Sequence, residues 1–180
     1  MDTLRRLAAL ASLGLLAALA APGCASTAAP AGPPEAGRDE STAAYERIKG
    51  LAGSWKGTFS GGGETTVTWR VTSGGTSVEE VLFGGTPHEM ITMYHLDGPR
   101  LLLTHYCAAG NQPTMVLGPG AGDGLLRFEF LRGTNMAPED GHMHRAVMDL
   151  TEAGRVKSTW TFFEGGQAGH DAVIEVRPVR

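Results

Sequence analysis

Cysteine is scarce in this chain: only Cys24 and Cys107 occur among 180 residues, which excludes a disulfide scaffold. The Cys-x-x-Cys and His-Glu-x-x-His spacings of common metal sites are also missing. After residue 20, no apolar run approaches the length of a transmembrane helix. The net charge of -4 provides no basic surface, which argues against nucleic acid as a partner. What remains is the composition of one mildly acidic domain with a sizeable core.

The N-terminus has the pattern of a bacterial signal sequence. Arg5 and Arg6 precede an apolar run over residues 7–20, and small residues at 21–23 lead to Cys24. This segment resembles a lipobox, which implies a signal peptide over residues 1–23 and a lipid on Cys24. We therefore predict an envelope protein anchored in a membrane through its lipid, on the outer membrane or periplasmic face if the cell is Gram-negative. Ala21 stands where a lipobox usually has leucine, so ordinary cleavage and secretion stay open.

Residues 24–40 contain mostly Ala, Pro, Gly, Ser and Thr, a composition typical of a disordered tether. Ser41 is a suitable N-cap for a short helix that ends at Lys49, before Gly50. Tyr45, Ile48 and Leu51 form one apolar stripe on this segment. The folded domain is expected to cover residues 41–180.

From residue 54 onward, short runs rich in Thr, Val, Trp, Phe and Leu alternate with glycine-rich turns, a pattern typical of antiparallel strands. We expect ten strands: Ser54–Ser60, Thr65–Ser73, Thr76–Phe83, His88–Leu96, Arg100–Cys107, Thr114–Gly118, Leu125–Arg132, His142–Leu150, Arg155–Glu164 and Ala168–Val179. The links are short and no crossover helix is apparent. This all-β pattern favours an antiparallel up-and-down barrel, because closure removes exposed sheet edges.

The segment Leu51–Gly57 carries Gly53-x-Trp55 at the start of the first strand. Together with the strand count, it resembles the opening of calycin barrels, which include lipocalins and nitrobindins. The resemblance implies that Trp55 closes one barrel end beneath a basic residue of the last strand, for which Arg177 is the matching position. The segments 93–98, 104–113 and 142–144 resemble, more narrowly, an uncharacterised family of secreted bacterial lipocalin-like proteins. That family implies a fold and no established activity.

Several polar residues are candidates for a ligand site in the lumen. A two-residue turn at Asp97-Gly98 would pair Met90 with His105 and His88 with Cys107. Strand alternation then places one group of candidates on the same face, which we expect to line the lumen: His88, Tyr94, His105 and Cys107. Asn111 and Gln112 follow in a loop at the barrel mouth, where they are expected to contact a ligand.

His142 and His144 share one face of a later strand, and with His105 across the lumen they suggest a transition-metal site. Cys107 with His105 and Asn111 invites a thiol-nucleophile hypothesis, although a lone strand cysteine is usually a small buried hydrophobe. His170 matches the late haem-ligating histidine of nitrobindins by position only. Whether a metal or haem is bound stays open, and catalysis is not expected.

These features predict a barrel that binds a small, mostly apolar ligand, with no protein partner indicated. The alternatives are a haem- or metal-binding barrel with nitrobindin-like redox or isomerase activity, and a ligand-free structural or interaction domain.

Overall fold

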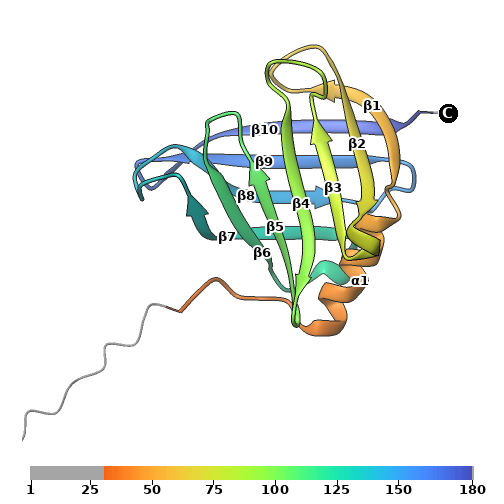
Figure 1. Cartoon of the computed structure of the whole chain (residues 1–180), viewed down its shortest axis with the longest axis horizontal. Coiled ribbons are helices and arrows are strands. Elements are labelled where there is room, and N and C mark those ends of the chain that lie inside the picture. The colour runs from red at the N-terminus through yellow and green to blue at the C-terminus, as the bar shows by residue number, and fades with distance from the viewer. Residues whose placement is uncertain (1–30, 180) are drawn as a thin grey trace, which may run out of the picture. The chain divides into compact units, whose positions relative to one another are not determined.

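Ten antiparallel strands follow one another around a closed barrel, as predicted (Figure 1). The computed structural model describes residues 31–179, so Cys24 and the predicted signal sequence lie outside the described residues. Each strand pairs with the next along the chain, and β10 pairs with β1 to close the barrel. The strands are β1 (Gly53–Phe59), β2 (Glu64–Thr72), β3 (Ser77–Leu82), β4 (Met90–Asp97), β5 (Arg100–Tyr106), β6 (Gln112–Leu117), β7 (Leu125–Thr134), β8 (His142–Asp149), β9 (Val156–Glu164) and β10 (Gln167–Pro178).

Alternation along the strands explains the core. In β2, Val67 and Trp69 are buried while their neighbours in the strand are exposed. In β10, Ile174 and Val176 are buried on either side of the exposed Glu175. The inward side chains of all ten strands join one contiguous apolar cluster inside the barrel. Because strands of this kind have one buried and one wet face, their register is strongly specified.

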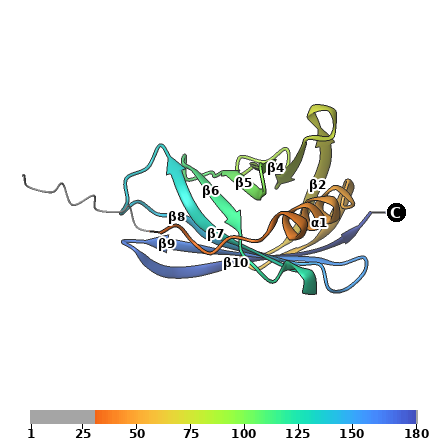
Figure 2. The same cartoon turned by 90° about the horizontal axis from the view of Figure 1, so that it is seen from below.

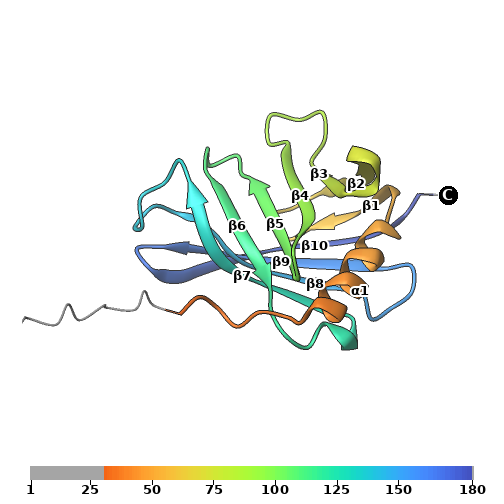
Figure 3. The same ribbon diagram turned by 60° about the horizontal axis from the view of Figure 1, so that its bottom comes forward.

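The up-and-down order gives the barrel two different ends. Loops 60–63, 83–89, 107–111, 135–141 and 165–166 all lie at one end, which we call the open end; Figure 1 shows them from the top to the left of the view. The other end, which we call the helix end, carries α1 (Arg38–Lys49) and the short helices η1 (Ser73–Gly75) and η2 (Ala121–Asp123). In Figures 2 and 3, α1 lies against the turn regions at this end.

The N-cap of α1 lies four residues before the predicted one, at Gly37 instead of Ser41. Gly37 precedes the helix in an extended conformation, without a side-chain cap, and Ser41 lies buried inside the helix rather than at its N-cap. Ala44, Tyr45 and Ile48 join the core, and the Tyr45 hydroxyl donates to the Gly75 carbonyl at 3.1 Å. The residues just before Ser41, assigned to the tether by the sequence, are therefore part of the folded domain. No helix within residues 31–179 is long and apolar enough to cross a bilayer.

Further bonds fix the chain around α1. The Ala36 N–H donates to the Leu117 carbonyl at 2.8 Å, and the Ala121 N–H donates to Oε1 of Glu40 at 2.5 Å. The first bond joins the approach to α1 to the last residue of β6, and the second joins α1 to η2. The helix end is thus closed by hydrogen bonds as well as by the apolar stripe.

Gly57 allows β1 and β10 to close the barrel. It pairs with Val176, and a Cβ atom at this position would lie 1.9 Å from the Glu175 carbonyl oxygen. Backbone atoms occupy the space that any side chain would need, so only glycine fits without moving a strand. The seam between the first and last strands therefore depends on this one residue.

The hairpin of β4 and β5 differs from the predicted register by two residues. Asp97 pairs with Arg100, so Gly98 and Pro99 form the turn, and His105 pairs with Thr92 instead of Met90. Proline has no N–H to donate, which favours its place in the turn rather than in a paired position. A shift of two residues keeps every side chain on its predicted face, and His105 does point into the barrel.

Candidate functional site

An apolar pocket of about 530 Å³ opens at the open end of the barrel. Phe59, Phe83 and Met90 form its apolar wall, and the rings of Phe59 and Phe83 meet edge to face with centroids 5.1 Å apart. Its polar contacts come from the loops and strand ends, namely Glu64, Thr86 and His88. A concave, mostly apolar surface with few polar groups is the usual form of a small-molecule site.

Beneath this pocket, four inward residues form a continuous row across β2, β3, β4 and β5. Trp69 pairs with Glu80, Glu80 with Thr92, and Thr92 with His105. All four are at most 2% exposed. On β4, Thr92 lies two residues from Met90 and therefore faces the same way, one position deeper than the pocket wall. We call Trp69, Glu80, Thr92 and His105 the polar row.

Glu80 is the acidic member of the polar row. The Tyr94 hydroxyl donates to its Oε2 at 2.5 Å. Burial raises the pKa of Glu80 from 4.5 to about 7, although the bond from Tyr94 acts in the opposite direction. Burial, together with the neighbouring Glu80, also raises the pKa of Tyr94 well above its ordinary value. The carboxyl thus changes its charge near neutral pH while the phenol stays protonated.

His105 is the basic member of the polar row. Its Nδ1 shares a hydrogen bond of 3.0 Å with the Thr92 hydroxyl, and its ring lies 4.6 Å from that of Trp160. Trp160 belongs to β9, on the opposite side of the barrel, so this contact crosses the lumen. Burial lowers the pKa of His105 from 6.5 to about 4, which keeps the imidazole neutral at physiological pH.

Four buried polar atoms in this region lack a hydrogen-bond partner: Nε1 of Trp69, Oε1 of Glu80, Nε2 of His105 and Nε1 of Trp160. Buried polar groups are nearly always paired, because an unpaired one costs about 1–3 kcal/mol. Their concentration in one part of the lumen is the most unusual chemical feature of the described residues.

The predicted candidates separate into two depths. Tyr94 and His105 lie deep in the lumen, whereas His88 is an exposed loop residue on the pocket rim, because β4 begins at Met90 and not at His88. Cys107 is half-buried near the rim, with Sγ 4.0 Å from Sδ of Met90. No nucleophile triad forms around it, because the Asn111 side-chain amide donates to the Gly141 carbonyl and His105 bonds Thr92.

Asn111 and Gln112 brace the loops of the open end. The Asn111 amide joins the β5–β6 loop to the start of β8, and the Gln112 amide donates to the Gly110 carbonyl at 3.1 Å. Oε1 of Gln112 accepts from the Thr134 hydroxyl. These contacts tie both side chains to neighbouring loops, while Oδ1 of Asn111 is buried without a hydrogen-bond partner among the described residues.

His142 and His144 bind each other instead of framing a metal site with His105. His142 Nδ1 donates to the Asp140 carbonyl at 2.8 Å, so in the neutral ring Nε2 accepts from Nδ1 of His144 at 2.9 Å. His144 is stacked on the ring of Phe163, with centroids 4.1 Å apart. Burial, followed by the charge of His142, lowers the pKa of His144. Within residues 31–179, no three metal-binding side chains come together.

His170, the haem-ligand candidate, is exposed near the open end and stacks on Phe162 at 5.1 Å. A break in the β9–β10 register between Ala168 and Asp171 surrounds it. The ring is therefore part of the rim and not of the polar row.

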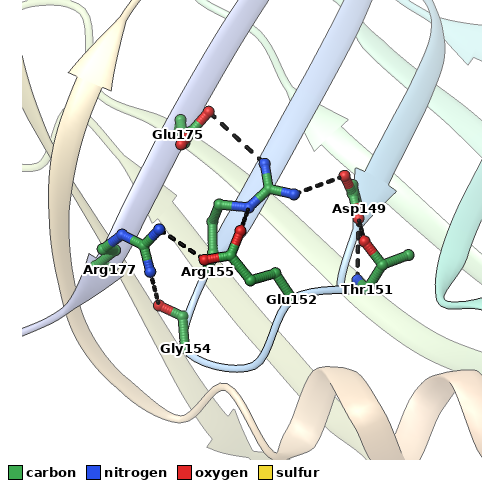
Figure 4. Close-up of polar contacts among 7 residues, drawn as sticks. All are labelled: Asp149, Thr151, Glu152, Gly154, Arg155, Glu175 and Arg177. Atoms are coloured by element: carbon green, nitrogen blue, oxygen red, sulfur yellow. Dashed lines mark hydrogen bonds and ion pairs between the residues drawn. The ribbon is translucent and has the colours of Figure 1, made fainter.

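The predicted contact between Arg177 and Trp55 is wrong. Trp55 donates from Nε1 to the Leu51 carbonyl at 2.8 Å and meets Trp69 edge to face. Arg177 lies on the outer face of β10, where its guanidinium donates to Glu152 at 2.7 Å and to the Gly154 carbonyl (Figure 4). Strand alternation sends Arg177 outward, because its neighbour Val176 faces the core.

Arg155 is a second basic residue near this end of the barrel, and it is more shielded from solvent than Arg177. It lines a second pocket together with Trp55, and only 16% of its side chain is exposed. Asp149, Glu152 and Glu175 surround its guanidinium at 3.1, 2.8 and 3.7 Å (Figure 4). Three carboxylates thus face one cation, and these ion pairs fasten the β8–β9 loop to β10.

Sequence reasoning missed Glu80, although a signal was present. Glu79 and Glu80 are consecutive in a strand, so one of them must face the lumen. Glu80 has the same parity as Val78 and Leu82, both fully buried, whereas Glu79 pairs with Arg70 outside. Strand alternation alone thus identifies Glu80, and not Glu79, as the inward carboxylate.

No protein-family model matches this sequence, and no curated protein matches it. Among solved structures, the chain is similar to the crystal structure of Rv2717c from M. tuberculosis, with 14% sequence identity. The alignment covers 76% of this chain and 98% of that chain, with a TM-score of 0.49. A likeness of this degree bears on neither ligand nor activity.

Proposed function

We propose that the barrel binds a small, mostly apolar molecule through its open end, with a polar group of the ligand directed to the polar row. The observation that carries this proposal is the position of an apolar pocket directly above unpaired buried atoms. Burying an apolar chain against Phe59, Phe83 and Met90 stabilises the complex by about 25 cal/mol per Å² of apolar area. The polar row then supplies hydrogen bonds that also fix the orientation of the ligand.

The wall of the pocket is suited to ligands of different shapes. Met90 forms part of it and is partly buried against the core. Unbranched thioether side chains change rotamer readily and fill irregular spaces. Met90 and Thr92 are successive inward residues of β4. A rotation of the Met90 side chain would therefore open a path from the pocket toward Thr92.

The proposed location rests on the sequence. A lipid on Cys24, followed by a short tether, would hold the barrel at a membrane surface of the cell envelope. A protein so placed would take up or release apolar molecules close to the bilayer.

The binding proposal is tested with N-phenyl-1-naphthylamine, a neutral apolar probe whose fluorescence rises when it leaves water. The wild-type domain should bind it saturably, and Met90→Trp, which fills the pocket, should weaken binding by about tenfold or more. Met93→Trp is the matched control, because Met93 lies on the other face of β4. Equal binding by both variants would contradict the pocket, and no binding by any form would leave the ligand-free barrel.

Native mass spectrometry and a visible spectrum of the purified protein test the haem and metal alternative. A Soret band or a stoichiometric metal would replace the proposal with that alternative. No contact in the described residues specifically favours it, because His105 bonds Thr92 and His142 bonds His144.

A further inference from the structure

Glu80 gives the lumen an unusual charge. Within residues 31–179 it is the only acidic side chain that is fully buried, and no lysine or arginine is buried with it. Oε2 is paired with Tyr94, while Oε1 has no partner. Buried carboxylates are normally paired with a cation or fully hydrogen-bonded, so this one lacks half of its usual partners.

The other titratable groups around Glu80 keep their charge constant near neutral pH. The pKa of Tyr94, from β4, is raised well above its ordinary value, and the pKa of His105, from β5, is lowered to about 4. Trp69 from β2 and Thr92 from β4 complete the row and do not titrate in this range. Between about pH 6 and pH 8, therefore, Glu80 is the group among Tyr94 and the polar row whose charge changes.

We propose, on the basis of the function proposed above, that Glu80 makes the lumen select a ligand whose head donates a hydrogen bond and carries no negative charge, such as an alcohol or an amine. A carboxylate head would meet a second carboxylate with no cation between them. A hydroxyl group would donate to Oε1 of Glu80 and could accept from the unpaired N–H of Trp69, its cross-strand neighbour. An ammonium head would form an ion pair with the same oxygen.

The layer above the polar row sets the length of the ligand. Leu82 and Met90 pair across β3 and β4 and are the inward residues next to Glu80 and Thr92 on the side of the open end. A ligand head reaches Glu80 only by displacing these two side chains, so its apolar chain must fill the space they leave and the pocket above. A ten-carbon chain is a reasonable probe for a pocket of about 530 Å³.

The test compares decanol, decylamine and decanoate, which share one chain and differ in the head. Each displaces N-phenyl-1-naphthylamine from wild-type protein, Glu80→Gln and the control Glu79→Gln, in which the changed carboxyl lies on the outer face. At about pH 8, decylamine should bind most tightly in the wild type, and decanoate should bind about tenfold or more weakly than decanol. Glu80→Gln should reduce the differences in affinity among the three ligands, and Glu79→Gln should leave these differences unchanged.

The pH dependence adds a second measurement, made on the wild type with Glu80→Gln as the comparison, in which the pH effect of Glu80 should be absent. As the pH rises from about 6 to about 8, decylamine should bind more tightly to the wild type and decanoate more weakly, because both ligands keep their charge while Glu80 loses its proton. Equal affinity for decanol and decanoate, or failure of all three to displace a probe that itself binds, would overturn the selectivity and leave the proposed function standing. A protein that binds neither probe nor ligands would instead refute the proposed function.

Discussion

Glu80 and His105 are expected to impose opposite pH dependences on the stability of the barrel. The pKa of Glu80 rises from 4.5 to about 7 on folding, so its contribution is fully present below pH 4.5 and is lost as the pH rises through 7. The pKa of His105 falls from 6.5 to about 4, so its contribution is fully present above pH 6.5 and is lost as the pH falls through 4. Each shift corresponds to about 3 kcal/mol, at about 1.4 kcal/mol per pH unit.

In the wild type these two slopes largely cancel between pH 4.5 and pH 6.5. A variant that lacks one of the two groups should therefore show the pH dependence that the other group imposes. Relative to the wild type, Glu80→Gln should gain about 3 kcal/mol of unfolding free energy as the pH rises from 4.5 to 7, because the cost of the buried carboxylate is gone. His105→Gln should show the opposite trend, with its relative stability greatest near pH 4 and about 3 kcal/mol lower at pH 6.5.

Urea unfolding at a series of pH values measures these differences as shifts in midpoint at constant slope. Glutamine suits both positions, since its carbonyl can accept from Tyr94 and its amide can bond Thr92. Glu79→Gln, on the outer face of the same strand, controls for the loss of a carboxyl group. If Glu80→Gln follows the wild type at every pH, the carboxyl is not buried in the manner described and the reasoning fails.

Three further outcomes follow from other parts of the chain. Trp55→Ala should lower the unfolding free energy by about 3–5 kcal/mol, because Trp55 is buried and bonded to the Leu51 carbonyl; a melting temperature within a degree or two of the wild type would contradict this. Gly57→Val should prevent β1 from pairing with β10, because a side chain at this position would meet the backbone of β10. An NMR amide spectrum of the variant that resembles the wild-type spectrum would contradict this, since it would show that the two strands can move apart to admit a side chain. Cys24→Ser should release the protein from the membrane fraction and change its processed mass, whereas unchanged mass and membrane association would exclude lipidation.

The barrel was predictable because strands and turns carry local signals. Alternation with period two and glycine-rich links define ten strands, and the same alternation places Tyr94 and His105 on one inward face. The pairing register of β4 and β5 was harder to predict, because Asp97-Gly98 and Gly98-Pro99 are both plausible turns. Only the missing N–H of Pro99 favours the second turn over the first.

The site was less predictable because it depends on contacts between distant strands. The spacing of His142 and His144 assumes a regular strand, but the β8–β9 register shifts between Met143 and Arg145, and the two rings meet each other. Likewise, no local pattern reveals that Trp160 on β9 reaches His105 across the lumen. Strand alternation alone predicts that Glu80, and not Glu79, is the buried carboxylate. It does not predict that Oε1 of Glu80 lacks a hydrogen-bond partner.

The continuous hydrogen-bonded wall has a consequence for how the protein can respond to a guest molecule. Every strand is hydrogen-bonded to both of its neighbours, and at Gly57 the backbones of β1 and β10 are already in contact. The barrel therefore cannot widen without breaking these hydrogen bonds. Accommodation must then come from side-chain rotations, those of Phe59, Phe83 and Met90 in the pocket wall and that of Leu82 beneath it. The rate at which ligands exchange would be governed by these side-chain rotations, and the largest ligand that fits would be set by the rigid backbone of the barrel.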